Sequence, residues 1–304
     1  MMKRDLLSVK DLLSDMNEVL TLAQNLKEGK IRKDGMLKGK TLAMIFEKPS
    51  TRTRVSFEVG MAQLGGHALY LSPKDLQLGR GETIADTARV LSKYVNAIMY
   101  RAFSHDALLE LAKHASVPVI NGLDDVEHPC QIVADLLTIL EKKGGFKGIK
   151  MAYVGDGNNV CNSLLLGAAI VGLNFVVACP SGYEPNKDIA AEARSIAHRN
   201  GCESLIVRDP VDAVRGADVI YTDVWTSMGQ EEEAKVRESA FIPYQVNSRL
   251  VSNAKEDCII MHCLPAHRGQ EITDEVIEGK NSVVFDQAEN RLHAQQAILL
   301  KLIQ

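Results

Sequence analysis

Five consecutive polar residues, Ser50-Thr51-Arg52-Thr53-Arg54, follow a short apolar run and open a predicted helix. Backbone N–H groups in the first turn of a helix lack partners within the helix, and the helix dipole is positive there. Arginine adds a planar guanidinium group that matches phosphate oxygens, and the hydroxyl groups add donors that rotate to fit. The segment therefore predicts an anion site for phosphate or a phosphate ester.

The two arginines of this segment are expected to have different roles. Arg52 and Arg54 lie two positions apart, so they face different sides of the helix. We expect one to serve the ligand and the other the structure. A simple Ser/Thr helix cap with two solvated arginines is the alternative interpretation, but an anion site at the carboxyl end of a strand is typical of open α/β sheets.

Three further polar residues stand near the predicted ends of strands and helices. Arg101 ends a predicted strand, His128 directly precedes a predicted helix, and Gln131 lies about one helical turn beyond His128. An arginine and a histidine can polarise a carbonyl group as its oxygen gains negative charge. The amide oxygen of Gln131 can accept a hydrogen bond from an NH2 group. Taken singly, such residues are more often ordinary surface residues.

Two segments of the second half resemble cofactor or metal motifs, and their details argue against both. Gly155-Asp156-Gly157-Asn158-Asn159-Val160 follows a predicted strand, but valine stands where a dinucleotide fold needs its third glycine. The next strand ends in Cys179-Pro180, without an acidic residue for ribose. His262 and Cys263 are adjacent on a predicted strand and point to opposite faces, with no C-x-x-C partner. We predict no cofactor and no metal.

Together, the polar motifs resemble those of a known family. Ser50-Thr51-Arg52-Thr53-Arg54 with Phe57-Glu58 is similar to the carbamoyl-phosphate signature of the aspartate and ornithine carbamoyltransferases. His128-Pro129-Cys130-Gln131 and His262-Cys263-Leu264-Pro265 match further motifs of the family in the same order. The segment 223–229, Asp-Val-Trp-Thr-Ser-Met-Gly, resembles the D-x-x-x-S-M-G loop that distinguishes ornithine enzymes from aspartate enzymes. The resemblance covers essentially the whole chain.

The resemblance implies a role for each matching residue. The residues implied to bind carbamoyl phosphate are Ser50, Thr51, Arg52, Thr53, Gln77, Arg101, His128, Gln131, Cys263, Leu264 and Arg291. Those implied to bind ornithine are Asn159, Asp223, Ser227 and Met228. The implied catalytic residues are Arg52, Arg101, His128 and Cys263. Gln77 lies in a loop that in the family reaches a neighbouring subunit, which implies a homotrimer or a multiple of one. Arg291 is expected to open the last helix.

The implied reaction transfers the carbamoyl group of carbamoyl phosphate to the δ-amine of L-ornithine, giving L-citrulline and phosphate, without a metal or a covalent intermediate. An alkyl ammonium resembles lysine, with a pKa of roughly 10.4, so it must lose a proton before it attacks. We expect Cys263 and Asp223 to position or deprotonate it. The oxyanion and the departing phosphate would be stabilised by Arg52, Thr53, Arg101 and His128.

Two alternatives remain open at this point. A related carbamoyltransferase would use putrescine, acetylornithine or aspartate as the acceptor, although intact Ser227-Met228-Gly229 and His262-Cys263-Leu264-Pro265 argue against each. A non-catalytic sensor or scaffold of the same fold would bind carbamoyl phosphate without turnover, yet every family position that we can place has the expected residue. The physiological direction also stays open, because arginine synthesis and citrulline breakdown use the same site.

The elements that must hold these residues alternate in a βαβ pattern after an N-terminal helix at about Ser14–Gly29. We expect an α/β fold of two doubly wound domains, each a mostly parallel sheet flanked by helices, with the active site in the cleft between them. The carbamoyl-phosphate domain is assigned to residues 1–143 and the ornithine domain to 144–287, with a C-terminal helix at 288–304 that returns to the first domain. The last predicted strand is Val283–Phe285.

Composition sets the remaining limits. The 304 residues, 46% of them apolar and 24% charged, exceed one typical domain. A net charge of −4 gives no basic excess to attract nucleic acid or a membrane surface. Six cysteines without paired spacing indicate reduced thiols. The N-terminus lacks a secretory core, and no apolar stretch reaches the roughly 18 residues of a membrane span. We expect a cytoplasmic protein that acts on small molecules.

Overall fold

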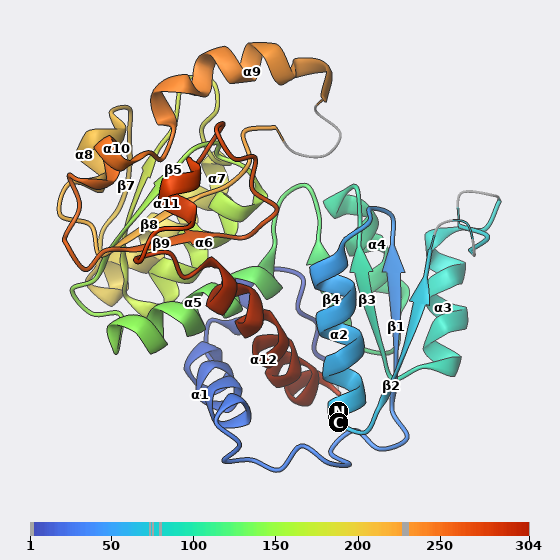
Figure 1. Cartoon of the computed structure of the whole chain (residues 1–304). Helices are drawn as coiled ribbons and strands as arrows, with labels where there is room; N and C mark the ends of the chain where they lie inside the picture. Colours follow the sequence, from blue (N-terminus) through green and yellow to red (C-terminus); the bar gives the residue numbers. More distant parts are fainter. Residues whose placement is uncertain (1–2, 73, 75, 79–80, 227–230, 304) are drawn as a thin grey trace. The chain divides into compact units, whose positions relative to one another are not determined.

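The computed structural model describes residues 3–72, 74, 76–78, 81–226 and 231–303. The chain forms two compact units (Figure 1). The first contains Met1–Leu137 and Glu289–Gln304, and the second contains Thr138–Ala288. The chain thus passes from one unit to the other within α5, Pro129–Lys143, and returns within α12, Val284–Leu302. The boundaries that we assigned from the sequence, after residues 143 and 287, stay a prediction.

The first unit is built on a four-stranded parallel sheet with the order β2-β1-β3-β4. Its strands are β1 Thr41–Phe46, β2 His67–Leu71, β3 Ala97–Arg101 and β4 Val119–Leu123. Its helices before α5 are η1 Val9–Leu12, α1 Met16–Lys27, α2 Thr51–Gln63, α3 Ile84–Tyr94 and α4 His105–His114. Strand β3 is buried along its whole length, which is typical of a parallel strand covered on both faces.

Alternating side chains of this sheet separate its two faces. Ala43 and Ile45 of β1 and Ile98 and Tyr100 of β3 pack with buried residues of α3 and α4 in one core. On the other face the ring of Phe46 packs against the ring of Tyr70, and the guanidinium of Arg54 from α2 lies over the Tyr70 ring. The sheet is therefore covered on both faces by the helices that connect its strands (Figure 1).

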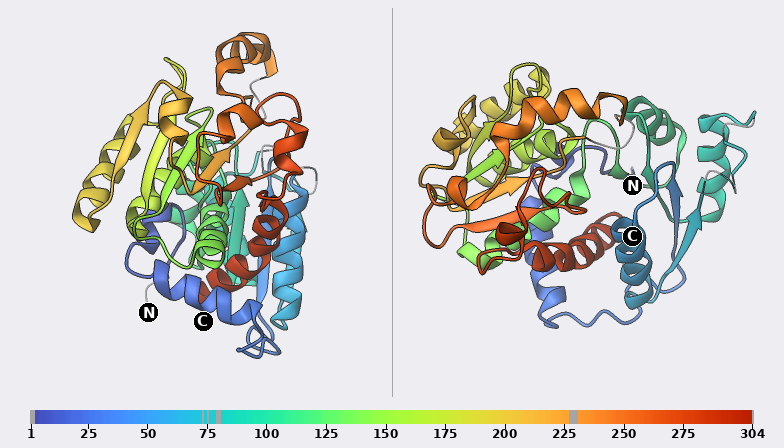
Figure 2. Two further views of the ribbon diagram at one scale, coloured as in Figure 1. Left: turned by 60° about the vertical axis from the view of Figure 1, so that its left-hand side comes forward. Right: turned by 45° about the horizontal axis from the view of Figure 1, so that its top comes forward.

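The C-terminal helix α12 packs against α2 within the first unit, as the views of Figure 2 show. Gly60 of α2 lets the two helices approach closely, because a Cβ atom there would lie 3.4 Å from Gln296 and 3.7 Å from Leu292. The Gln296 amide also donates a 2.7 Å hydrogen bond to Gln63. This packing brings the middle of α12 to the first unit.

The second unit has a five-stranded parallel sheet with the order β7-β6-β5-β8-β9. Its strands are β5 Lys150–Val154, β6 Asn174–Ala178, β7 Ser204–Val207, β8 Val219–Thr222 and β9 Ile259–His262. Its helical segments are α6 Asn159–Val171, α7 Lys187–Asn200, α8 Pro210–Val214, η2 Glu231–Glu233, α9 Ala234–Phe241, η3 Ile242–Tyr244, α10 Ser248–Val251 and α11 Asp274–Ile277. The strand order reverses between β5 and β8, which is where open α/β sheets bind ligands.

The start of α6 depends on a close approach of two backbone segments. The Asn158 side chain caps the helix by accepting hydrogen bonds from the N–H groups of Val160 and Cys161. A Cβ atom on Gly157 would lie 2.2 Å from the backbone nitrogen of Pro185. Glycine is required here for that approach, which is a structural reason for the Gly-Asp-Gly sequence that resembled a dinucleotide motif.

Two details of the C-terminal region differ from the sequence predictions. No strand forms at Val283–Phe285: Ser282 makes an isolated bridge to Ile260, and α12 already begins at Val284. The two valines are buried, so tertiary packing overrides their β propensity. As a result Arg291 lies about two turns inside α12 and does not open it. No helix in the described part of the chain is long and apolar enough to cross a membrane.

Candidate active site

The polar segment after β1 forms the N-terminus of α2, as predicted. Ser50 is the N-cap in extended conformation, and its hydroxyl oxygen accepts a 3.2 Å hydrogen bond from the N–H of Thr53. Thr51 is exposed and Arg52 is half-buried. The Thr53 hydroxyl is buried and accepts a 3.2 Å hydrogen bond from Nη2 of Arg291. The cap residues thus order the turn at the N-terminus of α2, and we call the segment Ser50–Arg54 the phosphate cradle.

Arg54 is tied to the surface of the first unit. Its Nε donates a 3.1 Å hydrogen bond to Glu58, and its guanidinium lies 3.8 Å from the centroid of the Tyr70 ring. These contacts give Arg54 a structural role, whereas the charge of Arg52 acts on the buried His128. Of the two arginines in the motif, Arg52 is therefore the candidate for ligand binding.

The charges of three guanidinium groups act on His128, which is itself buried. Its pKa is held well below the ordinary value for histidine, first by burial and then by the charges of Arg291, Arg101 and Arg52. The imidazole is therefore neutral at pH 7. Arg101 and Arg291 are 5% and 2% exposed. So many like charges with so little solvent favour binding of an anion that compensates them.

The strand register explains why these residues meet. Phe46 at the end of β1 pairs with Arg101 at the end of β3, and Arg101 pairs with Leu123 at the end of β4. The carboxyl ends of three parallel strands therefore lie at one edge of the sheet. The segments that follow them carry the cradle and His128, so residues far apart in sequence share one site.

Gln131 makes contacts that its sequence position did not reveal. Its amide oxygen accepts a 2.6 Å hydrogen bond from Nη1 of Arg291, and its amide nitrogen donates a 2.8 Å hydrogen bond to Asp135. We had expected the amide oxygen to accept from a substrate NH2 group. In this structure it orients Arg291, and its second lone pair is the part that a substrate can use.

A second cluster of predicted residues forms at the edge of the second sheet. Thr222 of β8 pairs with His262 of β9, so the residues that follow them, Asp223 and Cys263, are neighbours. The Cys263 thiol donates a 3.0 Å hydrogen bond to Oδ1 of Asp223. The other carboxylate oxygen accepts a 2.8 Å hydrogen bond from Asn158. Asp223 is 6% exposed, so this carboxylate offers a nearly desolvated negative group to a cation.

The same cluster places three potential metal ligands together, and their hydrogen bonds show that they do not fit a metal. One ligand atom each of Asp223, His262 and Cys263 lie within 4.8 Å of one another. Nδ1 of His262, however, accepts a 2.9 Å hydrogen bond from the N–H of Leu264, and Nε2 lies 3.0 Å from Glu271. Both ring nitrogens are thus engaged within the chain, and the imidazole offers no lone pair to a metal.

Comparison with known proteins finds two family profiles that match successive parts of the chain. The sequence profile described as "Aspartate/ornithine carbamoyltransferase, carbamoyl-P binding domain" matches residues 4–141. The profile described as "Aspartate/ornithine carbamoyltransferase, Asp/Orn binding domain" matches residues 147–302. The chain belongs to the aspartate/ornithine carbamoyltransferase family. The fold class predicted from the sequence, two domains with parallel sheets flanked by helices, is confirmed.

Similar relatives within the family include enzymes named for both physiological directions. The catabolic ornithine carbamoyltransferase of Thermoplasma volcanium is 56% identical, with 100% of this chain and 99% of the relative covered. The anabolic enzyme of Pyrococcus furiosus is 59% identical, with 97% of this chain and 95% of the relative covered. A solved structure of the Pyrococcus furiosus ornithine carbamoyltransferase has a TM-score of 0.96 at 57% identity, covering 99% of this chain and 97% of the other.

Several residues of this family member contribute to the sites although sequence reasoning missed them. Asn158 donates a hydrogen bond to Asp223, and the Asn159 amide oxygen accepts from the N–H of Val160. The predicted contact of Asn159 with the substrate stays a prediction. Lys48 is buried, and its pKa is lowered by burial and by the charge of Arg101. That lysine adds a further cation near the phosphate cradle. Its place two residues before the motif was the one available signal.

A buried ion pair supports the segment after Asp223. Arg237 of α9 pairs with Asp156, and its Nε donates a 2.7 Å hydrogen bond to the carbonyl oxygen of Trp225. Its guanidinium also lies 4.8 Å from the centroid of the Tyr183 ring. Burial raises the pKa of Asp156 to about 6 in spite of the arginine. The pair therefore anchors the backbone beside the predicted ornithine site.

The turn that leads to His128 is organised by a buried carboxylate. Asp124 has no exposed surface, and it accepts hydrogen bonds from His105 Nδ1, from Asn121 Nδ2 and from two backbone N–H groups at distances of 2.7–2.8 Å. The bond to Asp124 raises the pKa of His105, and the charges of Glu127 and Asp125 act in the same direction. This contact gives the stability of the turn a pH dependence.

We expect His105→Gln to destabilise the protein at acidic pH more than at alkaline pH. A group whose pKa is higher in the folded state adds stability that is fully present below its unfolded pKa, about 6.5 for histidine, and that is lost as the pH rises through the folded pKa. The measurement is the free energy of unfolding of both proteins in denaturant at pH 5.5 and pH 9. An equal difference at the two pH values would contradict the assignment.

Three of the predicted site residues lie near or among the residues that the structure does not describe. Gln77 is exposed, in the segment between β2 and α3. Ser227 and Met228 lie outside the described residues.

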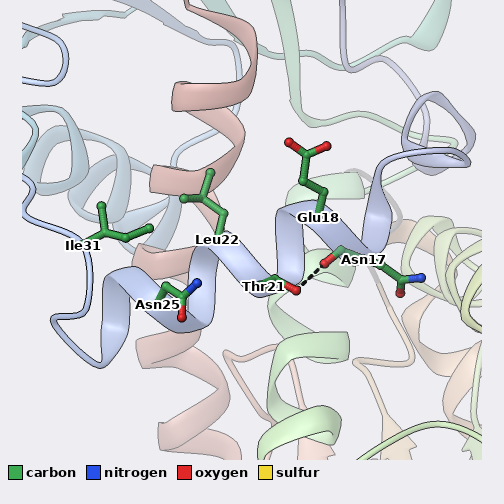
Figure 3. Close-up of a pocket in the computed structure, with 6 residues that line it drawn as sticks. All are labelled: Asn17, Glu18, Thr21, Leu22, Asn25 and Ile31. Atoms are coloured by element: carbon green, nitrogen blue, oxygen red, sulfur yellow. Dashed lines mark hydrogen bonds between the residues drawn. The ribbon is translucent and has the colours of Figure 1, made fainter.

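The structure also has a hollow of about 440 Å³ on the first unit, lined by Asn17, Glu18, Thr21, Leu22, Asn25 and Ile31 of α1 and the segment after it (Figure 3). None of the residues that line it belongs to the predicted sites, and we assign it no function.

Proposed function

We propose that this protein transfers the carbamoyl group of carbamoyl phosphate to the δ-amine of L-ornithine, giving L-citrulline and phosphate. The observation that carries the proposal is the set of three arginines whose charges act on the buried, neutral His128, beside the N-terminus of α2. Relatives named ornithine carbamoyltransferase, at 56–60% identity over nearly the full chain, support ornithine as the acceptor.

The first unit supplies the phosphate and carbonyl contacts of this proposal. Arg52 and the backbone N–H groups at the α2 N-terminus bind the phosphate oxygens. Arg101 and neutral His128 donate to the carbonyl oxygen, whose negative charge grows as the amine attacks. Neutral His128 has one N–H group, and this group donates the hydrogen bond that polarises the carbonyl. The other proposed carbamoyl-phosphate contacts of the first unit are Ser50, Thr51, Thr53, Gln77, Gln131 and Arg291. Those of the second unit are Cys263 and Leu264.

The second unit supplies the amine contacts. The carboxylate of Asp223 attracts the ammonium form of the substrate, and the thiol of Cys263 lies beside it at hydrogen-bond distance. The δ-ammonium gives up one proton to the Asp223 carboxylate, which passes it to solvent, and the free amine then attacks the carbonyl carbon. The second proton of the attacking nitrogen leaves with the departing phosphate. A C–N bond forms, the C–O bond to phosphate breaks, and phosphate leaves with the bonding electron pair. Asn159, Ser227 and Met228 are the remaining proposed ornithine contacts.

A product assay with a panel of acceptors tests this function. Purified protein is incubated with carbamoyl phosphate and L-ornithine, putrescine, N-acetylornithine or L-aspartate, and each carbamoylated product is measured. We expect citrulline from ornithine, with a kcat/KM at least about a hundredfold above that of the other acceptors, because a site built for polar groups rejects analogues that lack them. A preference for another acceptor would replace ornithine in the proposal. Tight binding of a phosphonate analogue without any product would indicate a sensor.

Replacing Cys263 with serine should lower kcat more than it weakens carbamoyl-phosphate binding. The smaller, less polarisable hydroxyl would keep a hydrogen bond to Asp223 but displace the amine, and we expect a fall in kcat of roughly ten- to a hundredfold. Steady-state kinetics and calorimetric binding of a phosphonate analogue separate the two effects. Loss of analogue binding with unchanged kcat would contradict the proposed role at the amine.

We further propose that the protein is a homotrimer, or a multiple of one, assembled through the first unit. Strand β2 is an edge strand, and large exposed apolar residues lie on it and on the neighbouring helices α2 and α3. They are Val55, Val59, Leu69, Val90 and Tyr94. Exposed apolar groups of this kind are typical of protein interfaces. Sedimentation should give a multiple of three 33.3 kDa chains, and a monomer would contradict this.

The cysteines support a reducing location. All six cysteines are free, and Cys130, Cys161, Cys179 and Cys258 are buried. Proteins from oxidising compartments commonly pair such thiols. We therefore propose that the protein is cytoplasmic.

A further inference from the structure

We propose that Glu271 is a positioning residue for the amine site. Through His262 it fixes the backbone of Leu264, and this backbone in turn fixes the thiol of Cys263 against Asp223. The inference rests on the function proposed above and adds a residue to its second site. Glu271 lies between β9 and α11, eight positions beyond Cys263, and nothing in its sequence context marked it.

The His262 ring has a defined hydrogen-bond arrangement. It has no exposed surface, and its Nδ1 accepts a 2.9 Å hydrogen bond from the N–H of Leu264. Because Nδ1 must present a lone pair to that donor, the network assigns the ring proton to Nε2. Nε2 lies 3.0 Å from Oε1 of Glu271 and donates to it. The ring thus transmits the position of the carboxylate to the Leu264 backbone.

Glu271 is itself a fixed point. Its backbone carbonyl accepts a 2.8 Å hydrogen bond from the N–H of Val246, and the next residue, Ile272, bridges to the same valine. Oε1 also accepts a 2.6 Å hydrogen bond from the N–H of His267. The side chain has no exposed surface. One carboxylate oxygen therefore holds both the ring of His262 and the backbone that follows the Cys263 segment.

The Cys263 segment needs such support because its backbone is unusual. Leu264 has a φ of 57°, in the left-handed region that leucine rarely adopts. A residue held there returns to an ordinary conformation when its neighbours no longer prevent it. The N–H of Leu264 is the group that His262 holds. Rotation of that peptide would move Cys263, and with it the thiol that donates to Asp223.

The hydrogen bonds of Glu271 allow substitutions that separate the effect of its side-chain length from the effect of its negative charge. Oε2 is buried and has no hydrogen-bond partner among the residues that the structure describes. Glutamine can therefore present its carbonyl oxygen to the same two donors and place its NH2 group where Oε2 lies. Aspartate keeps the charge but is one methylene shorter, so it cannot reach both donors. Methionine keeps the length and accepts neither bond.

We expect the kinetics of three variants to follow reach and not charge. Glu271→Gln should stay within about threefold of the wild-type kcat for citrulline formation. Glu271→Asp and Glu271→Met should lose roughly ten- to a hundredfold, as is typical when a catalytic group is displaced. The KM for carbamoyl phosphate should change less than the KM for ornithine. If Glu271→Met does not fold, the order of Glu271→Gln above Glu271→Asp decides.

A second measurement does not depend on activity. The rate at which iodoacetamide alkylates Cys263 can be followed by mass spectrometry of its peptide, because four of the other five cysteines are buried. Release of the thiol from Asp223 should raise this rate roughly threefold or more in Glu271→Asp and Glu271→Met, and leave it unchanged in Glu271→Gln. If the wild type forms no citrulline, the proposed function fails, while the alkylation rates still test the role of Glu271.

Asp218 provides a matched control. It is a buried carboxylate directly before β8, at the opposite end of that strand from Asp223, and it accepts hydrogen bonds from the Lys150 N–H and from Lys255. Asp218→Asn should lower the unfolding temperature without changing kcat or the alkylation of Cys263. Wild-type kinetics and alkylation in Glu271→Met, or equal impairment of Glu271→Gln and Glu271→Met, would overturn the proposal.

Discussion

Replacing Arg52 with alanine is expected to lower kcat/KM for carbamoyl phosphate by roughly a thousandfold. Arg52 stands in the first turn of α2, and its charge contributes to the lowered pKa of His128. The transition state carries charge on the carbonyl oxygen and on the departing phosphate, so loss of one guanidinium removes stabilisation from both. Steady-state kinetics with varied carbamoyl phosphate at saturating ornithine measure this loss. Calorimetry with a phosphonate analogue shows how much of it is ground-state binding.

Arg54→Ala is the control for this substitution. It removes the same side chain two positions along the same helix, but Arg54 contacts Glu58 and Tyr70. We expect a small loss of stability and a kcat/KM within about threefold of wild type. Equal losses in the two variants would mean that damage to the helix, and not the position of Arg52, lowers kcat/KM. Near wild-type kinetics of Arg52→Ala would contradict the assignment of the phosphate cradle to the active site.

Sequence patterns predicted those parts of the fold that depend on residues close together in the sequence, such as helix ends and buried strands. Pro129 fixes the start of α5 and the glycines after Lys143 fix its end, and the structure has the helix at those residues. The strands were recognisable because parallel strands covered on both faces are continuous apolar runs. The same rule failed at Val283–Phe285, where two buried valines belong to the start of a helix. A short apolar run does not by itself separate these two cases.

The site was predictable only in part. The residues that support the predicted site residues are held by contacts between parts of the chain that are far apart in sequence. The motif segments that contain Arg52, His128 and Cys263 are short and contiguous, so a sequence pattern can carry them. Arg237 and Asp156 are separated by 81 positions, and no local pattern links them. The contact of Arg291 with Gln131 spans 160 positions. Such partners depend on strand order and helix packing, which the alternation of elements does not specify.

Asp223→Asn should lower kcat/KM for ornithine by roughly a hundred- to a thousandfold, because truncating the charge of a buried, hydrogen-bonded partner typically costs about 2–5 kcal/mol. The carboxylate is 6% exposed and accepts from the Cys263 thiol on one oxygen and from Asn158 on the other. Asparagine keeps the shape but turns one acceptor into a donor. It also removes the charge that attracts an ammonium. Kinetics with varied ornithine at saturating carbamoyl phosphate measure the effect.

This variant should leave the proposed carbamoyl-phosphate contacts intact, since the arginines and His128 belong to the first unit. Calorimetric binding of a phosphonate analogue should therefore stay within about twofold of wild type, while citrulline formation falls. The Asp218→Asn variant, at the other end of β8, accounts for the cost of removing a buried carboxylate from this sheet. If Asp223→Asn and Asp218→Asn lose the same activity, the carboxylate of Asp223 acts through the fold. If only Asp223→Asn loses it, with analogue binding preserved, the amine is held where Cys263 and Asp223 meet.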